Sequence, residues 1–353
     1  MISAHMPIPF YRRSVVPIWI AAAFALLAAP GLRADLTWTA QTGWQLEGGA
    51  LSGLAGAQGR TALDLMNKAR RYEEDGSLHA AIKSYEKVGA KYPGSVYAPE
   101  ALFRAGKLLE RRRQYYNAFQ TFQVMLRRYP NTKRFNDVIG ELYRISADLL
   151  NGKRNWFWGW FPGPTNRNRG VEYFQVVVID APYSDYAPLA LMDAARGLQA
   201  DKDTEDAIDS LDRLVNTYPQ SVLAPVAYLK LGDLHASLSQ GPKYDQASTK
   251  EAMTYYEDYM ILYPGDSNIA AAAEGVDRMK TILAESKIYI GDYYFYKRLN
   301  FIAAKVFYNE AITSYPDSPP ARVAKKRLSD LDARTLRLNV APGSAPKKRF
   351  WLF

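Results

Sequence analysis

One short phrase returns along the chain: a helical-looking run ends in Tyr-Pro, and a small polar residue and a new helical start follow. Clear copies begin at residues 92, 129, 218, 263 and 315, and a weaker copy, Ala181-Pro182-Tyr183-Ser184, lies between the second and the third of them. The prolines of these copies stand at 93, 130, 182, 219, 264 and 316, so the successive steps are 37, 52, 37, 45 and 52 residues. A 37-residue unit that recurs with insertions predicts an all-α solenoid, a right-handed superhelix of about six helix pairs.

The composition narrows the class of protein. With 353 residues, 48% of them apolar, the chain can bury a large surface, which argues against global disorder. It holds no cysteine, and this excludes disulfides, thiolate metal sites, cysteine nucleophiles and an acylated lipoprotein cysteine. The formal charge of +9 falls to +6 without residues 1–34, which hold three arginines and no acid. This mild excess fits an acidic partner or an anionic membrane surface, and we expect no nucleic-acid partner.

Residues 1–34 have the pattern of an export signal. Arg12 and Arg13 form a basic flank, an apolar stretch follows, and Ala34 offers a small residue before Asp35. The apolar stretch has about 15 residues, short of the roughly 20 that a membrane-spanning helix needs. We therefore expect a signal peptide, and the alternative is an anchor that is not cleaved.

The segments that flank the repeats are expected to lack regular structure. Residues 35–60 are rich in Gly, Ala, Thr and Ser, which predicts a flexible linker; the alternative is a short extended arm that docks through Trp38 and Trp44. Residues 334–353 end in Lys-Lys-Arg-Phe-Trp-Leu-Phe, and we expect a disordered basic and aromatic tail. The alternative for this tail is peripheral contact with a membrane surface.

From Thr61 the units align on their prolines. Three of them place residues of the same size class at the same spacings: Leu65, Ala69, Tyr72, Ala81, Tyr85 and Val88; Leu102, Gly106, Leu109, Ala118, Phe122 and Met125; and Leu191, Ala195, Leu198, Ala207, Leu211 and Leu214. Small residues such as Gly106 and Ala118 let two antiparallel helices approach closely, and the large residues fill the core between them. The pattern resembles the tetratricopeptide (TPR) repeat and predicts a TPR-like domain over residues 61–333.

The less regular units are also predicted to be helical. The third has a first helix near 135–150, an insertion at 151–169 and a second helix near 170–179. Further along we expect a long helix that starts at Ile269 and a closing helix over 321–334.

The TPR resemblance implies that the first helix of each unit faces a concave groove. One position on this helix, five residues past the leading core residue, is Arg70, Lys107, Arg144 and Arg196 in the first four units and Asp233 in the fifth. The resemblance thus implies a basic ladder above an apolar floor that includes Met66 and Phe103, which suits an extended or C-terminal peptide. The alternative is a solvated basic stripe that forms only weak ion pairs with neighbouring acids.

The insertion at 151–169 carries an aromatic run. Five aromatic residues lie within six positions: Trp156, Phe157, Trp158, Trp160 and Phe161. One interpretation is a packing plug, and the other is an exposed anchor, since tryptophan is prominent at interface hot spots and at bilayer interfaces. We expect a partly buried loop with one exposed aromatic edge that contacts a protein partner.

No residue pattern indicates catalysis. His5 lies in the expected signal, and His79 and His235 lie on separate units without a neighbouring ligand or triad residue. The sequence has no phosphate loop, metalloprotease motif or nucleophile elbow. We therefore expect no catalytic residue, no cofactor and no metal site. A hydrolase without a recognisable motif is the remote alternative.

With its repeats placed, the array resembles the BamD family, TPR lipoproteins of the outer-membrane β-barrel assembly machinery. The clearest local likeness is Ala284 to Pro316, and the second is Ala81 to Pro130 with its paired Tyr-Pro ends. The resemblance implies a periplasmic scaffold at the inner face of the outer membrane. Such a scaffold binds the periplasmic domains of a barrel insertase, or unfolded outer-membrane proteins, through its N-terminal groove.

The chain departs from the BamD pattern at one point. The family carries a lipobox cysteine directly after the signal, and here Ala34-Asp35 stands in that place. We therefore expect an exported protein without a lipid anchor. The alternative function is a periplasmic TPR adaptor in cell-envelope maintenance or division, similar to the cell-division coordinator type.

Overall fold

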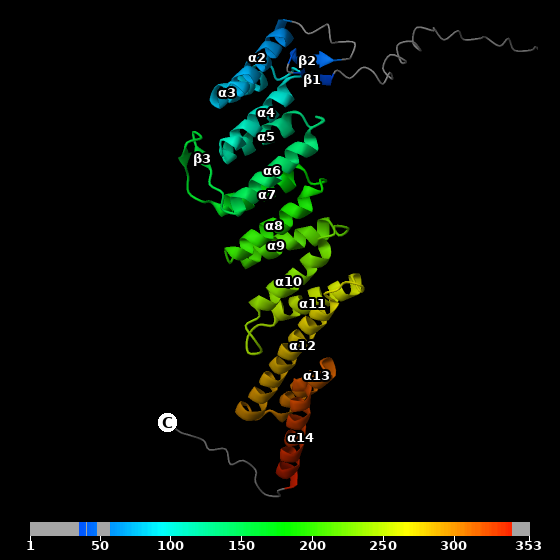
Figure 1. Cartoon of the computed structure of the whole chain (residues 1–353). Helices are drawn as coiled ribbons and strands as arrows, with labels where there is room; N and C mark the ends of the chain where they lie inside the picture. The colour runs from blue at the N-terminus through cyan, green and yellow to red at the C-terminus, as the bar shows by residue number, and fades with distance from the viewer. Residues whose placement is uncertain (1–34, 40, 48–56, 341–353) are drawn as a thin grey trace, which may run out of the picture. The chain divides into compact units, whose positions relative to one another are not determined.

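The computed structural model describes residues 35–39, 41–47 and 57–340, and most of them lie in helices (Figure 1). The expected signal peptide, residues 40 and 48–56 of the expected linker, and residues 341–353 of the expected tail lie outside the described residues. Internal contacts divide the chain into two compact units. The first comprises Met1–Lys133 and Trp156–Pro162, and the second comprises Arg134–Asn155 and Gly163–Phe353.

The first unit holds two helix pairs and two short hairpins. Its helices are α2 (Ala57–Glu74), α3 (Leu78–Lys91), α4 (Ala98–Arg111) and α5 (Tyr115–Arg128). Its strands are β1 (Asp35–Thr39), β2 (Gly43–Glu47), β3 (Trp156–Phe157) and β4 (Phe161–Pro162). β1 pairs antiparallel with β2, which sets Trp38 opposite Trp44, and β3 pairs antiparallel with β4.

The second unit continues the pairing of helices. In order they are α6 (Phe135–Leu150), α7 (Arg167–Asp180), α8 (Tyr186–Ala200), α9 (Thr204–Thr217), α10 (Ala224–Leu238), α11 (Ala247–Leu262), α12 (Ile269–Asp292), the π-helical turn η1 (Tyr293–Lys297), α13 (Phe301–Ser314) and α14 (Pro319–Val340). Within the described residues the two units thus contain six helix pairs and a closing helix, and the predicted all-α, TPR-like solenoid is confirmed.

Glycines on first helices make room for large side chains from second helices. A Cβ added at Gly106 of α4 would lie 2.5 Å from the Phe122 ring of α5. In the second unit, Cβ atoms at Gly232 of α10 and Gly275 of α12 would lie 2.5 and 2.7 Å from opposite edges of the Tyr256 ring of α11. The small residues predicted from the repeat spacing therefore set how closely consecutive helices approach.

The Tyr-Pro phrase has a structural role that explains its period. The Tyr129 hydroxyl donates a hydrogen bond of 2.7 Å to the Pro93 carbonyl, and the Tyr218 hydroxyl donates one of 2.7 Å to the Pro182 carbonyl. Each tyrosine thus binds the turn that ends the preceding repeat, 36 residues earlier. Both bonds occur where the repeat has its basic length of 37 residues, so the phrase joins neighbouring turns.

Two expectations about flanking segments need correction. Residues 35–39 and 41–47 form a β-hairpin and not a flexible linker, because Trp44 is buried against the helices and Gly43 takes the positive φ of 73° that the turn requires. Residues 334–340 extend α14 and are not disordered, because Leu331 packs into the core beside Tyr308 and the Arg334 guanidinium lies over the ring of Phe295.

Tyrosine–carboxylate hydrogen bonds recur inside both units. The donor and acceptor pairs are Tyr85 with Glu73 (3.2 Å) and, all at 2.6 Å, Tyr143 with Asp193, Tyr255 with Asp212, Tyr256 with Asp233 and Tyr308 with Asp292. Burial raises the pKa of each hydroxyl above its ordinary value, and the neighbouring carboxylate raises the pKa further. Each hydroxyl therefore stays protonated in the folded chain at a pH where it ionises in the unfolded chain.

This difference predicts a loss of stability in alkali. A folded-state pKa above the unfolded value stabilises the fold below the unfolded pKa, and the stabilisation disappears as the pH rises through the folded pKa. We expect the free energy of unfolding to fall as the pH rises above about 10, the ordinary tyrosine pKa. Urea titrations followed by circular dichroism measure this fall. Tyr308→Phe keeps the ring but lacks the phenol, so its pH dependence should be shallower; a slope equal to that of the unmodified chain would contradict this origin.

Candidate protein-binding surfaces

The four predicted groove cations all pair with acids on their own helices. Arg70 contacts Glu73 at 3.3 Å and Glu74 at 3.0 Å, Lys107 contacts Glu110 at 3.2 Å, Arg144 contacts Glu141, and Arg196 contacts Asp193 at 3.2 Å. Pairs three or four residues apart on an exposed helix are weak and screened by salt. Arg70 and Lys107 belong to the first unit, and Arg144 and Arg196 belong to the second. The role of these four cations in peptide binding stays a prediction, because ion pairs within one helix also fit the alternative of a solvated basic stripe.

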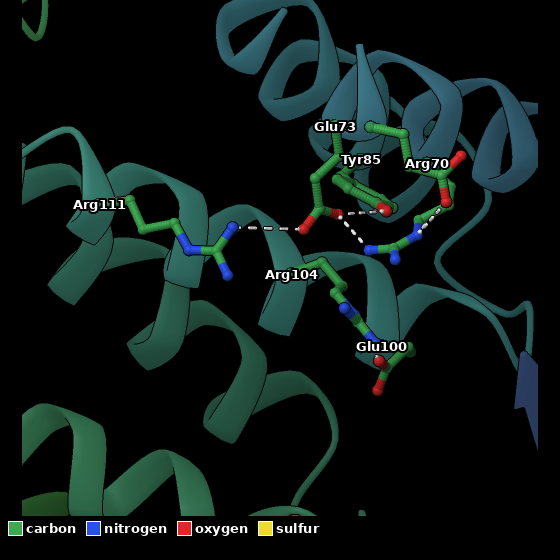
Figure 2. Close-up of polar contacts among 7 residues, drawn as sticks. Arg70, Glu73, Tyr85, Glu100, Arg104 and Arg111 are labelled. Atoms are coloured by element: carbon green, nitrogen blue, oxygen red, sulfur yellow. Dashed lines mark hydrogen bonds and ion pairs between the residues drawn. The ribbon is translucent and has the colours of Figure 1, made fainter. Parts of the chain in front are cut away.

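Arg70 belongs to a denser network in the first unit (Figure 2). The side chain of Glu73 is only 8% exposed, and its carboxylate accepts from the Tyr85 hydroxyl of α3. Arg111 of α4 reaches the same carboxylate at 3.6 Å, and Arg104 of α4 binds Glu100 at 2.9 Å. The Arg111–Glu73 contact ties the two first helices, α2 and α4, together, while Glu73 and Glu74 hold the guanidinium group of Arg70 and Glu100 holds that of Arg104.

The N-terminal hairpin covers part of this network. The Arg70 guanidinium carbon lies 4.2 Å from the centre of the Trp38 ring, and that of Arg104 lies 5.2 Å from the Trp44 ring. The Trp44 backbone N–H donates a hydrogen bond of 2.8 Å to the Asn67 side chain of α2. The structure therefore fits the alternative interpretation of this segment, an extended arm that docks through its tryptophans. Asn67 is a contact residue that the sequence analysis missed.

The predicted apolar floor needs revision. Met66 is fully buried, so it is not available to a groove ligand. The core stripe of α2 runs through Ala62, Met66 and Ala69, which turns Asn67 and Arg70 toward the hairpin. Phe103 is half-buried, with its ring centre 5.9 Å from that of Phe122.

The aromatic insertion folds into a second hairpin that is anchored on the turn between α4 and α5. The Trp156 N–H donates a hydrogen bond of 2.8 Å to the Arg113 carbonyl, and the Arg113 guanidinium lies 4.9 Å from the Trp156 ring. Arg112 donates to the Trp158 carbonyl. The side chain of Gln114 is buried. With its amide oxygen facing the hairpin, it accepts hydrogen bonds from the backbone N–H groups of Trp158 (3.2 Å) and Gly159 (3.0 Å). These contacts fix the base of the hairpin.

The tip of this hairpin is exposed. Trp158 and Trp160 are 67% and 68% exposed, and their rings stack with centres 6.1 Å apart. Phe157 and Phe161 flank them at 42% and 51% exposure, while Trp156 is half-buried at the base. A partly buried loop with an exposed aromatic edge is therefore what the structure contains. We call Phe157, Trp158, Trp160 and Phe161 the aromatic tip.

The second unit has an apolar groove that the sequence analysis did not predict. It has a volume of about 780 Å³ and lies between the turns that follow α7 and α9, among Pro182, Leu189 and Tyr218. Tyr183 and Val222 at its edge are 100% and 89% exposed. The sequence signal for this groove was the pair of proline-containing turns after α7 and α9, which the fold brings together.

The histidines and acids of the described residues form no evident reaction centre. His79 contacts Arg112 at 3.3 Å in the first unit, and His235 stacks on Tyr255 in the second, where burial lowers its pKa. Among residues 35–39, 41–47 and 57–340, no group of three or more histidine, aspartate or glutamate side chains is placed to hold a metal ion. None of the helices in that part of the chain is long and apolar enough to cross a membrane.

Comparison with known proteins gives matches over parts of the chain. Residues 166–338 match a family described as "Outer membrane lipoprotein" (YfiO), and residues 100–132 match a tetratricopeptide repeat family. Outer membrane protein assembly factor BamD of Caulobacter vibrioides is 25% identical over 153 residues, which are 43% of this chain and 46% of the relative. BamD of Xylella fastidiosa is 21% identical over 156 residues, 41% of this chain and 53% of the relative. The chain thus spans about half the length of the curated relatives it matches.

Solved structures include a tetratricopeptide repeat protein from Parabacteroides merdae, 15% identical, which aligns over 77% of this chain and 99% of its own with a TM-score of 0.30. The family matches and the curated relatives agree with the helix pairs described above. Over the matched parts, this chain is similar to the BamD proteins and to tetratricopeptide repeat proteins.

Proposed function

We propose that this chain is a non-catalytic scaffold in outer-membrane protein assembly, which binds other polypeptides in the periplasm at the inner face of the outer membrane. The observation that carries the proposal is the match of residues 166–338 to the outer membrane lipoprotein family, together with the BamD relatives. Its partners are the periplasmic domains of a barrel insertase or unfolded outer-membrane proteins. A repeat array suits this work because stacked helix pairs present a long surface to another chain.

The aromatic tip is the surface best built for a protein partner. Tryptophan is enriched among interface residues that contribute most to affinity. Arg112, Arg113 and Gln114 hold the base of the hairpin, so little conformational freedom remains to be lost when the tip binds. Two stacked indole rings already exposed to solvent gain most from being covered.

A binding measurement with purified components tests this function. The full chain would be titrated into a labelled, urea-unfolded outer-membrane β-barrel protein diluted to native conditions, and separately into the periplasmic domains of a barrel insertase. An unfolded soluble protein of equal length is the control. We expect saturable binding to one of the first two and at least tenfold weaker binding to the control. Equal binding to all three, or no saturable binding to either of the first two, would contradict the proposal.

The basic ladder gives a separate prediction for an acidic or carboxylate-ended peptide. Reversing Arg144 and Arg196, both in the second unit, to glutamate sets each new acid beside Glu141 or Asp193 and removes an exposed cation. Exposed charges of this kind contribute about 0.2–1 kcal/mol each, so for the two together we expect roughly a two- to thirtyfold loss of peptide affinity that shrinks at high salt. Isothermal titration at two salt concentrations measures this loss. Unchanged affinity would leave the ladder as a solvated stripe.

A further inference from the structure

The N-terminal hairpin lies on a surface that has the features of a peptide-binding seat. The seat consists of Asn67 and Arg70 of α2 and Arg104 of α4, the first helices of two consecutive repeats. The hairpin meets it with two indole rings and one backbone N–H. The TPR resemblance implies a groove on this side, and the cation expected there, Arg70, is the one that Trp38 covers.

We propose that the hairpin of residues 35–39 and 41–47 occupies in cis a seat that also takes a β-structured segment of another polypeptide, one that carries aromatic side chains on a single face. The incoming segment displaces the hairpin, stacks its aromatic rings on Arg70 and Arg104, and donates a backbone N–H to Asn67. This inference rests on the proposed function only in that the chain binds other polypeptides. It adds where such a segment binds and which side chains the seat selects.

The seat is fixed before any aromatic ring arrives. Glu73 and Glu74 hold Arg70, Glu100 holds Arg104, and the two guanidinium groups come from different helices (Figure 2). A planar guanidinium group attracts the face of an aromatic ring, most strongly that of tryptophan. Since Trp38 and Trp44 stand opposite each other across the hairpin, both rings leave the same face of the two strands. The seat thus fits a β-structured partner and not a helix.

The chemistry of the hairpin resembles that of an outer-membrane strand. Alternate residues of a β-strand share a face, and strands of outer-membrane barrels carry aromatic residues near both membrane interfaces. Leu36 and Trp38 alternate with Thr37 and Thr39 in β1. An unfolded barrel segment with two aromatic residues on one face can therefore make the contacts that the hairpin makes.

Displacement of the hairpin is feasible because two strands alone add little stability. A two-stranded hairpin is marginally stable on its own. The indole N–H of the buried Trp44 has no hydrogen-bond acceptor among the described residues, which weakens the docked state. Because the hairpin is tethered beside its seat, it competes at a high effective concentration and lowers the apparent affinity for any segment added in trans.

A labelled peptide with the sequence of residues 35–47 tests the inference on the full chain. We expect the double variant Trp38→Ala, Trp44→Ala to bind this peptide at least tenfold more tightly than the unmodified chain does. The further changes Arg70→Gln and Arg104→Gln should abolish the gain, whereas Arg128→Gln, an exposed arginine on α5, should preserve it. A peptide with both tryptophans replaced by alanine should not bind. Equal binding to the unmodified chain and the double variant, or no binding to either, overturns the proposal.

A second measurement leaves the hairpin intact. The chain has no cysteine, so a fluorophore on Gln45→Cys reports the exposed side of β2 alone. Excess peptide should lower the anisotropy of this label, and an unchanged anisotropy at saturating peptide overturns the proposal. Loss of helical content in the variant with Trp38→Ala and Trp44→Ala would also overturn the proposal, because it would show that the hairpin is needed for folding. If the peptide fails in both tests while unfolded barrel protein still binds, the proposed function stands without this seat. If the peptide binds and barrel protein does not, the seat stands and the proposed function fails.

Discussion

Replacing Tyr256 with alanine is expected to lower the free energy of unfolding by about 3–5 kcal/mol, the range found when a large buried aromatic side chain is removed. The Tyr256 side chain is 2% exposed and fills the space that Gly232 of α10 and Gly275 of α12 leave open. Its hydroxyl also donates a hydrogen bond of 2.6 Å to Asp233. Alanine would leave a cavity among three consecutive helices and an aspartate without its donor. Urea and thermal unfolding followed by circular dichroism measure the change.

Two matched variants separate the contributions to this effect. Tyr256→Phe keeps the ring and removes only the hydrogen bond, so we expect a loss of about 1–3 kcal/mol. Tyr255→Ala removes a half-buried neighbour on the same helix that bonds to Asp212, and its cost should be well below that of Tyr256→Ala. Equal costs for Tyr255→Ala and Tyr256→Ala would show that the glycine-lined contact does not hold these repeats together.

The repeat architecture could be predicted because its signals are local. Size classes at fixed spacings place Gly106 against Phe122, and the Tyr-Pro phrase marks where second helices end, since α3, α5, α9, α11 and α13 each end just before it. A helix pair needs only contacts between residues close in sequence, so its pattern remains visible in a single unit. The hydrogen bond between the Tyr129 hydroxyl and the Pro93 carbonyl joins neighbouring units at the same repeated phrase, so this contact also follows the repeat period.

The surfaces were harder to predict because they join segments that are distant in sequence. Trp38 meets Arg70, and Trp158 meets Arg112, 46 residues away, and no spacing rule encodes either contact. The error at Met66 has a different cause: alignment on Leu65 placed the core stripe one position early. One residue turns a side chain by about 100° around a helix of 3.6 residues per turn, which exchanges a groove position for a core position.

The largest effect on binding is expected at the aromatic tip. Trp158→Ala with Trp160→Ala removes the two most exposed indole rings of the hairpin. If the tip is the main partner contact, the affinity for the barrel insertase domains or unfolded barrel protein should fall by at least about 2 kcal/mol, roughly 30-fold. The same change should alter the free energy of unfolding by less than about 0.5 kcal/mol, because exposed side chains contribute little to folding. Fluorescence anisotropy and urea titration measure the two quantities on one sample.

The control for this variant is Tyr244→Ala, which removes an exposed aromatic residue from the second unit, away from the apolar groove. If any exposed aromatic ring contributed equally to partner binding, both variants would lower the affinity to the same extent. That result would contradict the aromatic tip as the main partner contact. A large drop in stability for the tryptophan variant would instead favour the packing plug. The geometry argues against that outcome: the hairpin base is held by Arg113 and Gln114 through backbone groups that the substitutions leave in place. Loss of affinity at unchanged stability, confined to the tip, is therefore the result that separates a binding surface from a structural one.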